Sequence, residues 1–302
     1  MANLKNIRKR IASVKSTQKI TRAMKMVAAA RLTRAQQRIL SIRPYAVKTA
    51  QVLAEIAATD PDEAASSEGQ HPLLARRPDK NALFIVITSD RGLCGAFNSN
   101  ILRTAERLWR SRDAAGQTSK FAIIGRKGRD YMRRRQAPVD HVFAGVWERL
   151  DFEQARGIAR RALVPFVRGE VDAIYLVYNE FKSAMTQRVV AEQLFPLPRP
   201  EGAQVQADSR DEWDRHREFL FEPGKGALLE RLVPMYVEIS ILRALLESMA
   251  SELGARMTAM DSATKNASDM ISNLTLEYNR ARQAAITTEL MEIIGGAEAL
   301  RE

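Results

Sequence analysis

The last third of the chain carries its longest regular pattern. Steps of alternately three and four residues from Ile239 reach sixteen positions, and thirteen of them are apolar. An apolar seam with this spacing is typical of a helix that pairs with another helix along its length. Pro234 can occupy the first turn, the glycine pair at 295–296 can close the stretch, and Gly254 is the internal weak point. Residues 235–294 therefore predict one helix of roughly 90 Å at about 1.5 Å per residue.

A second seam of the same spacing begins at the opposite end of the sequence. From Leu4 it covers thirteen positions, of which ten are apolar. Two such seams, separated by a compact middle, can pair within the chain as an antiparallel coiled coil or between chains. We expect the intrachain pairing, because the middle segment can act as the turn, while Pro44 kinks or restarts the first helix. The seam residues expected to hold the helices together are Leu4, Ile7, Ile11, Val14, Leu246, Met249, Leu253, Met260 and Leu274.

The positive charge of the chain is concentrated in the first of these helices. The net charge is +11, and residues 1–50 contain thirteen Lys or Arg but no Asp or Glu. Twelve of the thirteen cations lie off the seam, so the outer surface of this helix is suited to an acidic protein, nucleic acid or anionic lipid. A solvated basic face is the simpler alternative, and the pattern leaves both a passive spacer and a moving part open.

Other classes of protein fit the sequence poorly. No window approaches eighteen uninterrupted apolar residues, and no signal-peptide core is present. The basic N-terminus resembles a mitochondrial transit peptide, but its seam continues far beyond the length of one, so we expect it to be mature structure. The single Cys94 excludes an internal disulfide and a CxxC motif.

The middle of the chain alternates short apolar runs with helical patterns. This alternation predicts a Rossmann-like α/β domain with a mostly parallel sheet. We expect strands at 83–88, 121–125, 139–146 and 173–179, a last β-like run at 188–197, and helices at 97–112 (with Asn98 or Ser99 near its cap), 126–136 and 151–168. The expected divisions are an N-terminal coiled-coil helix (1–58), a polar loop (59–79), the α/β domain (80–198), a charged connector (199–226) and a C-terminal coiled-coil helix (227–302).

Nothing in this α/β domain forms a persuasive active site. The glycines follow strands with the short spacing GxxG, at Gly92/Gly95 and Gly125/Gly128, and no GxxxxGK[ST] loop occurs. A lone GxxG more often marks a tight turn than a phosphate cradle. The three histidines lie in different segments without metal-ligand spacing, and no GxSxG elbow is present. A second basic cluster at 126–135 is interpreted as a solvated helix face.

Four stretches are specific enough to indicate a family. They are residues 7–29 (IRKRI to TQKITRAMKMVAA), 88–95 (TSDRGLCG), 252–266 and 278–297 (YNRARQAAITTELMEIIGGA). Together they resemble the gamma subunit of F-type ATP synthases, in the right order and over essentially the whole chain.

The resemblance implies a fold and a role. In this family the terminal helices form an antiparallel coiled coil inside a ring of alternating alpha and beta subunits, and the α/β domain meets the epsilon subunit and the c-ring. One copy per complex acts as the central rotor shaft, which couples proton-driven rotation to the catalytic sites on beta. We therefore expect a noncatalytic subunit that binds no cofactor, metal or nucleic acid, because ATP, ADP and Mg²⁺ belong to the alpha and beta subunits.

The resemblance also carries over four residues as beta-subunit contacts. Arg256, Gln283 and Thr287 match positions that contact beta-subunit loops, and Met24 matches one that faces an acidic loop of beta. Each has a plainer alternative: Arg256 and Met24 can belong to the seam, and the other two can be ordinary exposed helix residues.

Two further features set the expected location. With one cysteine the chain cannot form the redox switch of chloroplast relatives, and the resemblance begins almost at Met1. We expect a bacterial protein, peripheral on the cytoplasmic face of the inner membrane and bound to it only through the c-ring. The runner-up is a nucleic-acid-binding coiled-coil protein, and a nucleotide-dependent enzyme is a third hypothesis.

Overall fold

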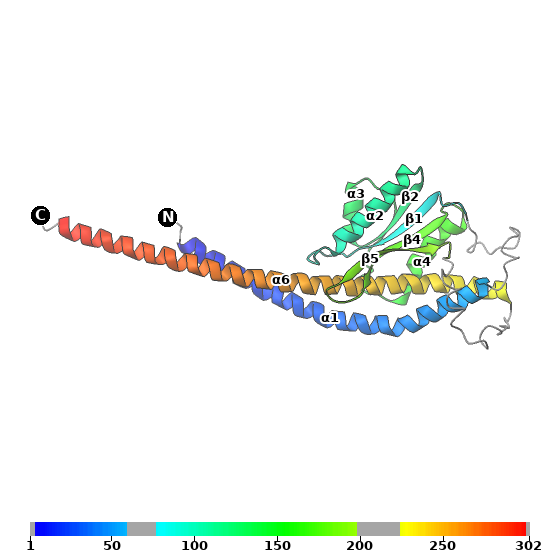
Figure 1. Ribbon diagram of the computed structural model, residues 1–302, viewed down its shortest axis with the longest axis horizontal. Helices are drawn as coiled ribbons and strands as arrows, with labels where there is room; N and C mark the ends of the chain where they lie inside the picture. The colour runs from blue at the N-terminus through cyan, green and yellow to red at the C-terminus, as the bar shows by residue number, and fades with distance from the viewer. Residues whose placement is uncertain (1–3, 59–76, 198–223, 300–302) are drawn as a thin grey trace, which may run out of the picture. The chain divides into compact units, whose positions relative to one another are not determined.

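The chain is built from two long terminal helices and an α/β domain between them in sequence. The computed structural model describes residues 4–58, 77–197 and 224–299. The helices are α1 (Leu4–Ala58) and α6 (Lys225–Ala299), as Figure 1 shows. The expected polar loop (59–79) and charged connector (199–226) fall almost entirely outside the described residues.

The chain separates into two compact units, and both long helices contribute to each. Unit 1 combines the chain up to Ala30 with the chain from Arg256 onward. Unit 2 is the continuous segment Arg31–Ala255, which includes the whole α/β domain.

Unit 2 contains one five-stranded sheet with the order β3-β2-β1-β4-β5. The strands are β1 (Asn81–Ile87), β2 (Thr118–Ile124), β3 (Val139–Phe143), β4 (Ala173–Phe181) and β5 (Gln187–Phe195). The first four are parallel, and β5 pairs with β4 in the antiparallel sense. The central strand β1 reads as a continuous apolar run because both faces of a parallel sheet are covered. The prediction of a mostly parallel sheet is confirmed.

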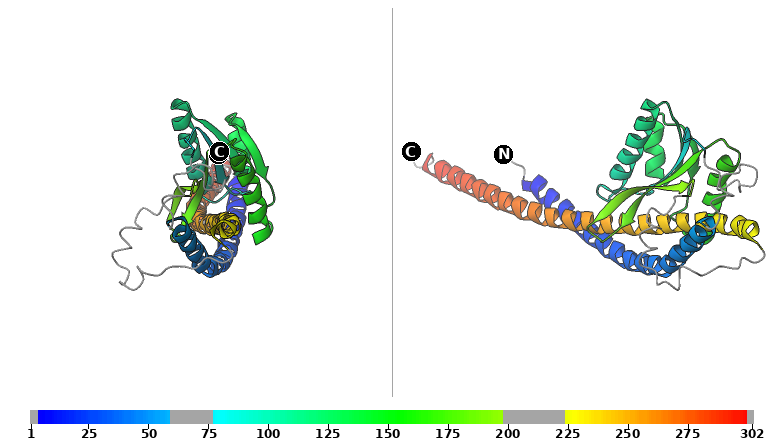
Figure 2. Two further views of the ribbon diagram at one scale, coloured as in Figure 1. Left: turned by 90° about the vertical axis from the view of Figure 1, so that its right-hand side faces the viewer. Right: turned by 45° about the vertical axis from the view of Figure 1, so that its right-hand side comes forward.

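Helices cover both faces of the sheet (Figures 1 and 2). The helices of the domain are α2 (Phe97–Ala114), α3 (Arg126–Arg134) and α4 (Phe152–Val167). Alternate residues of a strand point to opposite faces. Accordingly Phe84 packs in one cluster with α2 and α3, whereas Ile85 packs in another with α4 and α6.

Asn98 and Ser99 lie near the N-cap of α2, as expected. The helix begins after Ala96, which makes no side-chain capping bond. Asn98 bonds to the loop after β1 instead: its Oδ1 accepts from Ser89 N at 3.0 Å, and its Nδ2 donates to Ser89 Oγ at 2.8 Å. The Asn98 side chain, in the first turn of α2, thus stabilises the loop that follows β1. Asp151 does cap α4, because its Oδ1 accepts from Gln154 N at 3.0 Å.

The ends of α6 also differ from expectation. The helix begins at Lys225, so Pro234 lies inside it, and the glycine pair at 295–296 lies before its end. A proline in a helix leaves the carbonyl four residues earlier without its donor. Here that carbonyl belongs to the exposed Glu230, where water can replace the lost bond. At the other end of the sequence α1 continues through Pro44.

A charged cluster lies between α1, α6 and the β4–β5 pair within unit 2. Arg243 Nη2 is 2.7 Å from both carboxylate oxygens of Glu192, and Tyr178 donates to Glu192 Oε2 at 2.9 Å. Glu247 is less well placed, with Oε1 at 3.8 Å from Arg243 Nη1 and a buried Oε2 that has no hydrogen-bond partner in the described chain. The cluster borders a cavity of about 260 Å³ that α1 lines with Ile42 and its neighbours.

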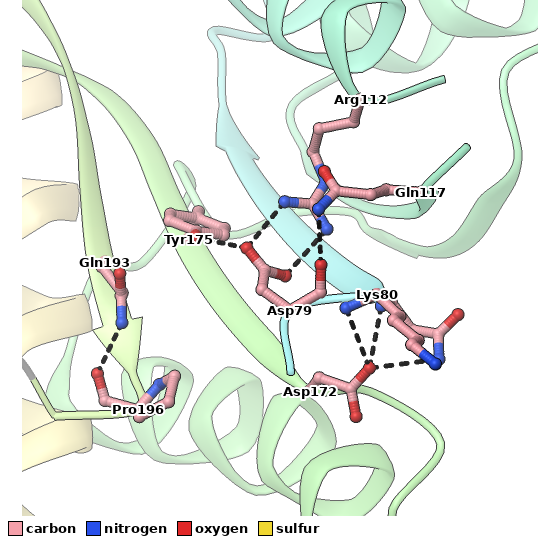
Figure 3. Close-up of polar contacts among 9 residues, drawn as sticks. Asp79, Lys80, Arg112, Gln117, Asp172, Tyr175, Gln193 and Pro196 are labelled. Atoms are coloured by element: carbon pink, nitrogen blue, oxygen red, sulfur yellow. Dashed lines mark hydrogen bonds and ion pairs between the residues drawn. The ribbon is translucent and has the colours of Figure 1, made fainter. Parts of the chain in front are cut away.

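A second polar network lies at the N-terminal ends of the neighbouring strands β1 and β4 (Figure 3). Asp79 accepts two bonds of 2.8 Å from the Arg112 guanidinium and one of 3.0 Å from Tyr175. Burial alone would raise the pKa of Asp79, but the bonds from Arg112 and Tyr175 outweigh burial and lower it. Burial and the bond to Asp79 raise the pKa of Tyr175 to about 12. Asp172 accepts from the backbone amides of Lys80 and Asn81 at 3.3 and 2.9 Å.

Candidate protein interface on the paired helices

In unit 1 the two terminal helices pair side by side with opposite chain directions (Figure 1). Thr21 Oγ1 lies 2.8 Å from Thr264 Oγ1, and Lys25 Nζ lies 2.5 Å from Asp261 Oδ1. A step forward along α1 is therefore a step backward along α6, so the predicted antiparallel intrachain pairing is confirmed. Unit 2 contains a further contact of this kind, where Leu32 of α1 packs in one cluster with Leu253 of α6.

The expected seam of α1 matches the side chains that the structure covers. All thirteen positions are buried or partly buried, and the off-seam positions between them are mostly exposed. Ile7 is buried, while Leu4, Ile11 and Val14 are partly buried. Because these positions repeat every 3.5 residues, they form one continuous strip along the helix.

The expected seam of α6 is right up to Ala267, and beyond it every second expected position is shifted by one residue. Leu246, Leu253, Met260 and Leu274 are buried, and Met249 is partly buried. The expected positions Met270, Glu277 and Ala284 are exposed, however, and Ile271, Tyr278 and Ala285 are partly buried in their place. The observed phase covers an isoleucine and a tyrosine and keeps the charge of Glu277 in water, where a carboxylate without a partner is far more stable.

The outer face of α1 in unit 1 is a surface of uncompensated cations. Within the described residues no ion pair involves Arg8, Lys9, Arg10, Lys15, Lys19 or Arg22, and all six are exposed. Lys25, which follows these six in the sequence, is paired with Asp261 of α6. Like charges along one helix face repel each other, so this surface favours a partner of opposite charge.

The end of α6 forms a second exposed surface, which the sequence reasoning missed. From Ile286 to Ala297 every side chain that the structure describes is exposed. Several are large and apolar, with exposed fractions of 49% for Ile286, 53% for Leu290, 65% for Ile293 and 56% for Ile294. Their spacing of three and four residues was the available signal, because it places them on one helix face. An exposed apolar face of this kind makes the end of α6 a candidate protein interaction site.

The four predicted contact residues lie on these helices but not at one place. Met24 and Arg256 are partly buried near the α1–α6 pairing, whereas Gln283 and Thr287 are exposed. Thr287 Oγ1 donates to Gln283 O at 3.0 Å, so its hydroxyl is bonded within the helix. About 40 Å of helix separates Arg256 from Gln283 at 1.5 Å per residue. The four predicted contact residues therefore occupy two separate regions along the pair rather than a single site.

The α/β domain offers no cradle for a phosphate at the glycine motif of α3. The amides that begin this helix are already bonded: Arg126 N to Asp90 Oδ1 at 2.8 Å, Lys127 N to Ser89 O at 3.1 Å and Gly128 N to Thr88 Oγ1 at 2.9 Å. A Cβ atom on Gly128 would stand 2.6 Å from Thr88 Oγ1. The glycine is needed for close packing, and the helix N-terminus has no free donors there.

Two other kinds of site are missing from the part of the chain that the structure describes. No group of three or more His, Cys, Asp or Glu side chains there is arranged to hold a metal ion. Among the same residues, no helix is both long and apolar enough to cross a membrane.

Comparison with known proteins identifies relatives over the full length of the chain. A family model described as ATP synthase matches residues 3–300. The chain is 59% identical to the ATP synthase gamma chain of Sorangium cellulosum (strain So ce56), and the match covers 100% of both chains. It is 46% identical to the ATP synthase gamma chain of Geobacter sp. (strain M21), again over 100% of both.

Solved structures with the same fold come from ATP synthase stalks. A chain from the central stalk and c-ring of the Tetrahymena thermophila mitochondrial ATP synthase is 28% identical, with a TM-score of 0.59 over 81% of this chain and 99% of that one. A chain from the Euglena gracilis mitochondrial ATP synthase rotor is 19% identical, with a TM-score of 0.63 over 94% of this chain and 98% of that one. At that identity the likeness concerns the fold alone. By its family-model match and its full-length relatives, the chain belongs to the ATP synthase gamma chain family.

Proposed function

We propose that this chain is the central rotor shaft of a proton-translocating F-type ATP synthase. The observation that carries the proposal is the antiparallel helix pair of unit 1, with an unpaired cationic face on α1 and an exposed apolar end on α6. Family membership supports the same role. The chain is a noncatalytic subunit, and ATP synthesis takes place on other subunits of the complex.

The helix pair is suited to this role because its sides are chemically different. The charged side chains that α1 exposes in unit 1 are all cations, whereas those that α6 exposes include both acids and bases such as Asp269 and Arg280. A catalytic site changes state only when a ligand or partner interacts differently with its alternative states. One asymmetric shaft inside a ring of equivalent sites presents a different side to each, and rotation exchanges those sides.

The proposed partners follow from this arrangement. Alpha and beta subunits surround the helix pair, the α/β domain contacts the epsilon subunit and the c-ring, and one copy is present per complex. Nucleotide and Mg²⁺ are bound by alpha and beta, so this chain binds no cofactor, metal or nucleic acid. The relatives from Sorangium and Geobacter are bacterial, which supports a peripheral location on the cytoplasmic face of the inner membrane through the c-ring.

The exposed features have distinct proposed roles within the ring. The cations of α1 attract acidic loops of beta broadly rather than through one locked pair, because exposed charges are partly screened by salt. Met24 and Arg256 contact beta along the pair, while Gln283 and Thr287 contact it nearer the apolar end of α6. The small Ala281, Ala284 and Ala285 keep the helix narrow in that region.

A rotation assay tests the proposal. Cys94 is buried, and Asp130 on α3 is exposed and lies outside both proposed contact regions. An Asp130→Cys variant therefore offers one reactive thiol for a bead on the assembled complex. We expect the chain to co-purify with alpha and beta subunits and the bead to turn in one direction on addition of ATP. Recovery of an isolated dimer on nucleic acid, or a stationary bead on a hydrolysing complex, would refute the proposal.

A further inference from the structure

The seam of α1 becomes polar at three successive positions in unit 1, namely Gln18, Thr21 and Lys25. Two of them meet polar partners on α6. Thr21 and Thr264 share a hydrogen bond of 2.8 Å, and Lys25 Nζ contacts Asp261 Oδ1 at 2.5 Å. We refer to Thr21, Lys25, Asp261 and Thr264 as the polar layer.

The hydrogen bonds of the polar layer are complete in the observed register. Each hydroxyl also has an acceptor within its own helix, Met260 O at 2.7 Å for Thr264 and Gln18 O at 3.1 Å for Thr21, and either hydroxyl can donate across the 2.8 Å contact between the helices. Asp261 Oδ2 also accepts from Lys265 at 3.2 Å, and hydrogen bonds from Lys25 and then Lys265 lower the pKa of the Asp261 carboxyl. Only at this alignment do Thr21 and Thr264, and Lys25 and Asp261, also contact each other across the pair.

The layer adds little to stability. The side chains of Lys25 and Asp261 are 43% and 34% exposed, and ion pairs at such exposure have a small net effect. Apolar residues at Thr21 and Lys25 would cover more apolar surface and hold the helices more tightly. Polar residues at seam positions are known instead to select one alignment at a cost in stability.

The rest of the seam does not select an alignment. On either side of the layer it is lined by buried side chains such as Ile7, Ala28, Ala267 and Leu274, which differ in size but form no hydrogen bonds between the helices. A slip of seven residues, about 10 Å along the helix, would keep apolar side chains against apolar ones. The same slip would separate Thr21 from Thr264 and Lys25 from Asp261. The two hydroxyls would keep only their bonds to Gln18 O and Met260 O within each helix, so both polar contacts between the helices would be lost without replacement.

We propose that the polar layer is a register lock, whose four members are positioning residues that make α1 and α6 turn as one body. The inference rests on the proposed rotor function. A register lock explains why polar residues interrupt the seam. It also fixes the position of the apolar end of α6 along the helix pair relative to the contact residue Met24 of α1.

Charge reversal in the assembled complex tests the lock. Lys25→Glu and Asp261→Arg each bring like charges together, and the double variant restores the attraction. We expect each single variant to lower the protons pumped per ATP hydrolysed by at least about threefold, and the double variant to recover most of the loss. Asp269→Arg is the matched control on α6, because Asp269 is exposed and off the seam; it should leave the ratio unchanged. Normal pumping in both single variants, or no recovery in the double variant, would overturn the lock.

A second measurement keeps the lock separable from the rotor role. In the full-length chain, Thr21→Cys with Thr264→Cys should form a disulfide on oxidation, because the native hydroxyls are 2.8 Å apart. We expect the yield to fall when Lys25→Glu is added and to return when Asp261→Arg is added as well. Equal yields in all three chains would refute the lock even if the complex rotates. If the chain is not a rotor, the complex does not rotate with the unaltered chain or with any variant. The disulfide yields still follow the pattern expected of the lock.

Discussion

The backbone of Ala184 lies directly against Gly254. A Cβ atom on Gly254 would stand 3.1 Å from the Ala184 carbonyl oxygen and 3.2 Å from the Ala184 Cα. Ala184 belongs to the turn between β4 and β5, and its carbonyl also accepts a bond of 2.9 Å from Gln187 Nε2. Gly254, the weak point of the helix in the sequence pattern, is therefore the residue at which the β4–β5 hairpin packs closely against α6.

This contact predicts opposite signs for two similar substitutions in α6. An alanine in place of a helical glycine normally stabilises a helix by up to about 1 kcal/mol. Gly296→Ala should show that gain, because nothing lies within 4 Å of the added Cβ. Gly254→Ala should instead lower the free energy of unfolding by about 1 kcal/mol, since the anchored Ala184 must move. Urea unfolding of the full-length chain measures both, and a gain at Gly254 would contradict the close approach.

The parts of the fold that the sequence predicted are those set by local periodicity. The seam of α1 was correct at every position because a 3.5-residue repeat specifies which side of a helix is buried. The second half of the α6 seam was wrong by one position at Met270 and Glu277. Counting apolar residues could not separate two phases that differ mainly in whether they bury Glu277 or Tyr278.

Other features depend on partners distant in sequence, so no local pattern could reveal them. Asn98 lies near the N-terminus of α2 as expected, but the pattern gives no sign that it bonds to Ser89 of the preceding loop. The antiparallel direction of β5 and the contact of Gly254 with Ala184 belong to the same class. For the candidate interface, the family resemblance supplied Arg256 and Gln283. The apolar end of α6 was recognised from the exposed fractions of its side chains in the structure.

The charged cluster of unit 2 predicts unequal effects for its two glutamates. Arg243 is mostly buried and takes its close ionic contacts from Glu192. Glu192→Gln removes that charge and should cost about 2–3 kcal/mol, because a buried cation loses its partner. Glu247→Gln should slightly raise the midpoint of thermal unfolding at neutral pH, by about 2 °C. Scanning calorimetry of both variants separates the two residues.

The gain from Glu247→Gln should depend on pH with a definite sign. Burial, and then the charges of Glu180 and Glu192 against the opposing Arg243, raise the pKa of Glu247. A carboxyl with a raised folded-state pKa destabilises the fold when ionised and stops doing so as it is protonated. The advantage of Glu247→Gln should therefore shrink as the pH falls through that raised pKa. An advantage that grew on acidification would show that Glu247 is stabilised as the anion.

The cationic face of α1 predicts a salt-dependent assembly defect. Lys15→Glu with Lys19→Glu should leave the stability of the isolated chain within about 0.5 kcal/mol, because both side chains are exposed. Association with alpha and beta subunits should slow by about tenfold or more at low salt, and the difference should narrow at high salt. Arg133→Glu with Arg134→Glu on α3 makes the same change of charge elsewhere. If both double variants slowed association equally, the cause would be the net charge of the chain rather than the cationic face of α1.

Arg256 predicts a loss of coupling without a loss of nucleotide binding. The proposed role of its guanidinium is to contact a beta-subunit loop, and nucleotides bind on other subunits. Arg256→Ala should lower ATP-driven proton pumping or assembly while the nucleotide affinity of the assembled ring stays the same. Arg256→Lys keeps the charge but not the planar fork, and it should retain only part of the function. Unchanged pumping in the alanine variant would limit Arg256 to a packing role in the helix pair.

The exposed end of α6 predicts a defect that appears only in the complex. Ile286 and Leu290 are 49% and 53% exposed in the chain alone, so Ile286→Ser with Leu290→Ser removes little buried surface and should shift thermal unfolding by less than about 2 °C. In the complex these side chains are proposed to enter a protein surface, where each apolar side chain is worth about 1.5–3 kcal/mol on burial. Proton pumping per ATP hydrolysed should therefore fall. Leu276→Ser is the control, because Leu276 is 70% exposed on the same helix but lies before the apolar end, and an equal loss from that variant would point to a general effect on α6.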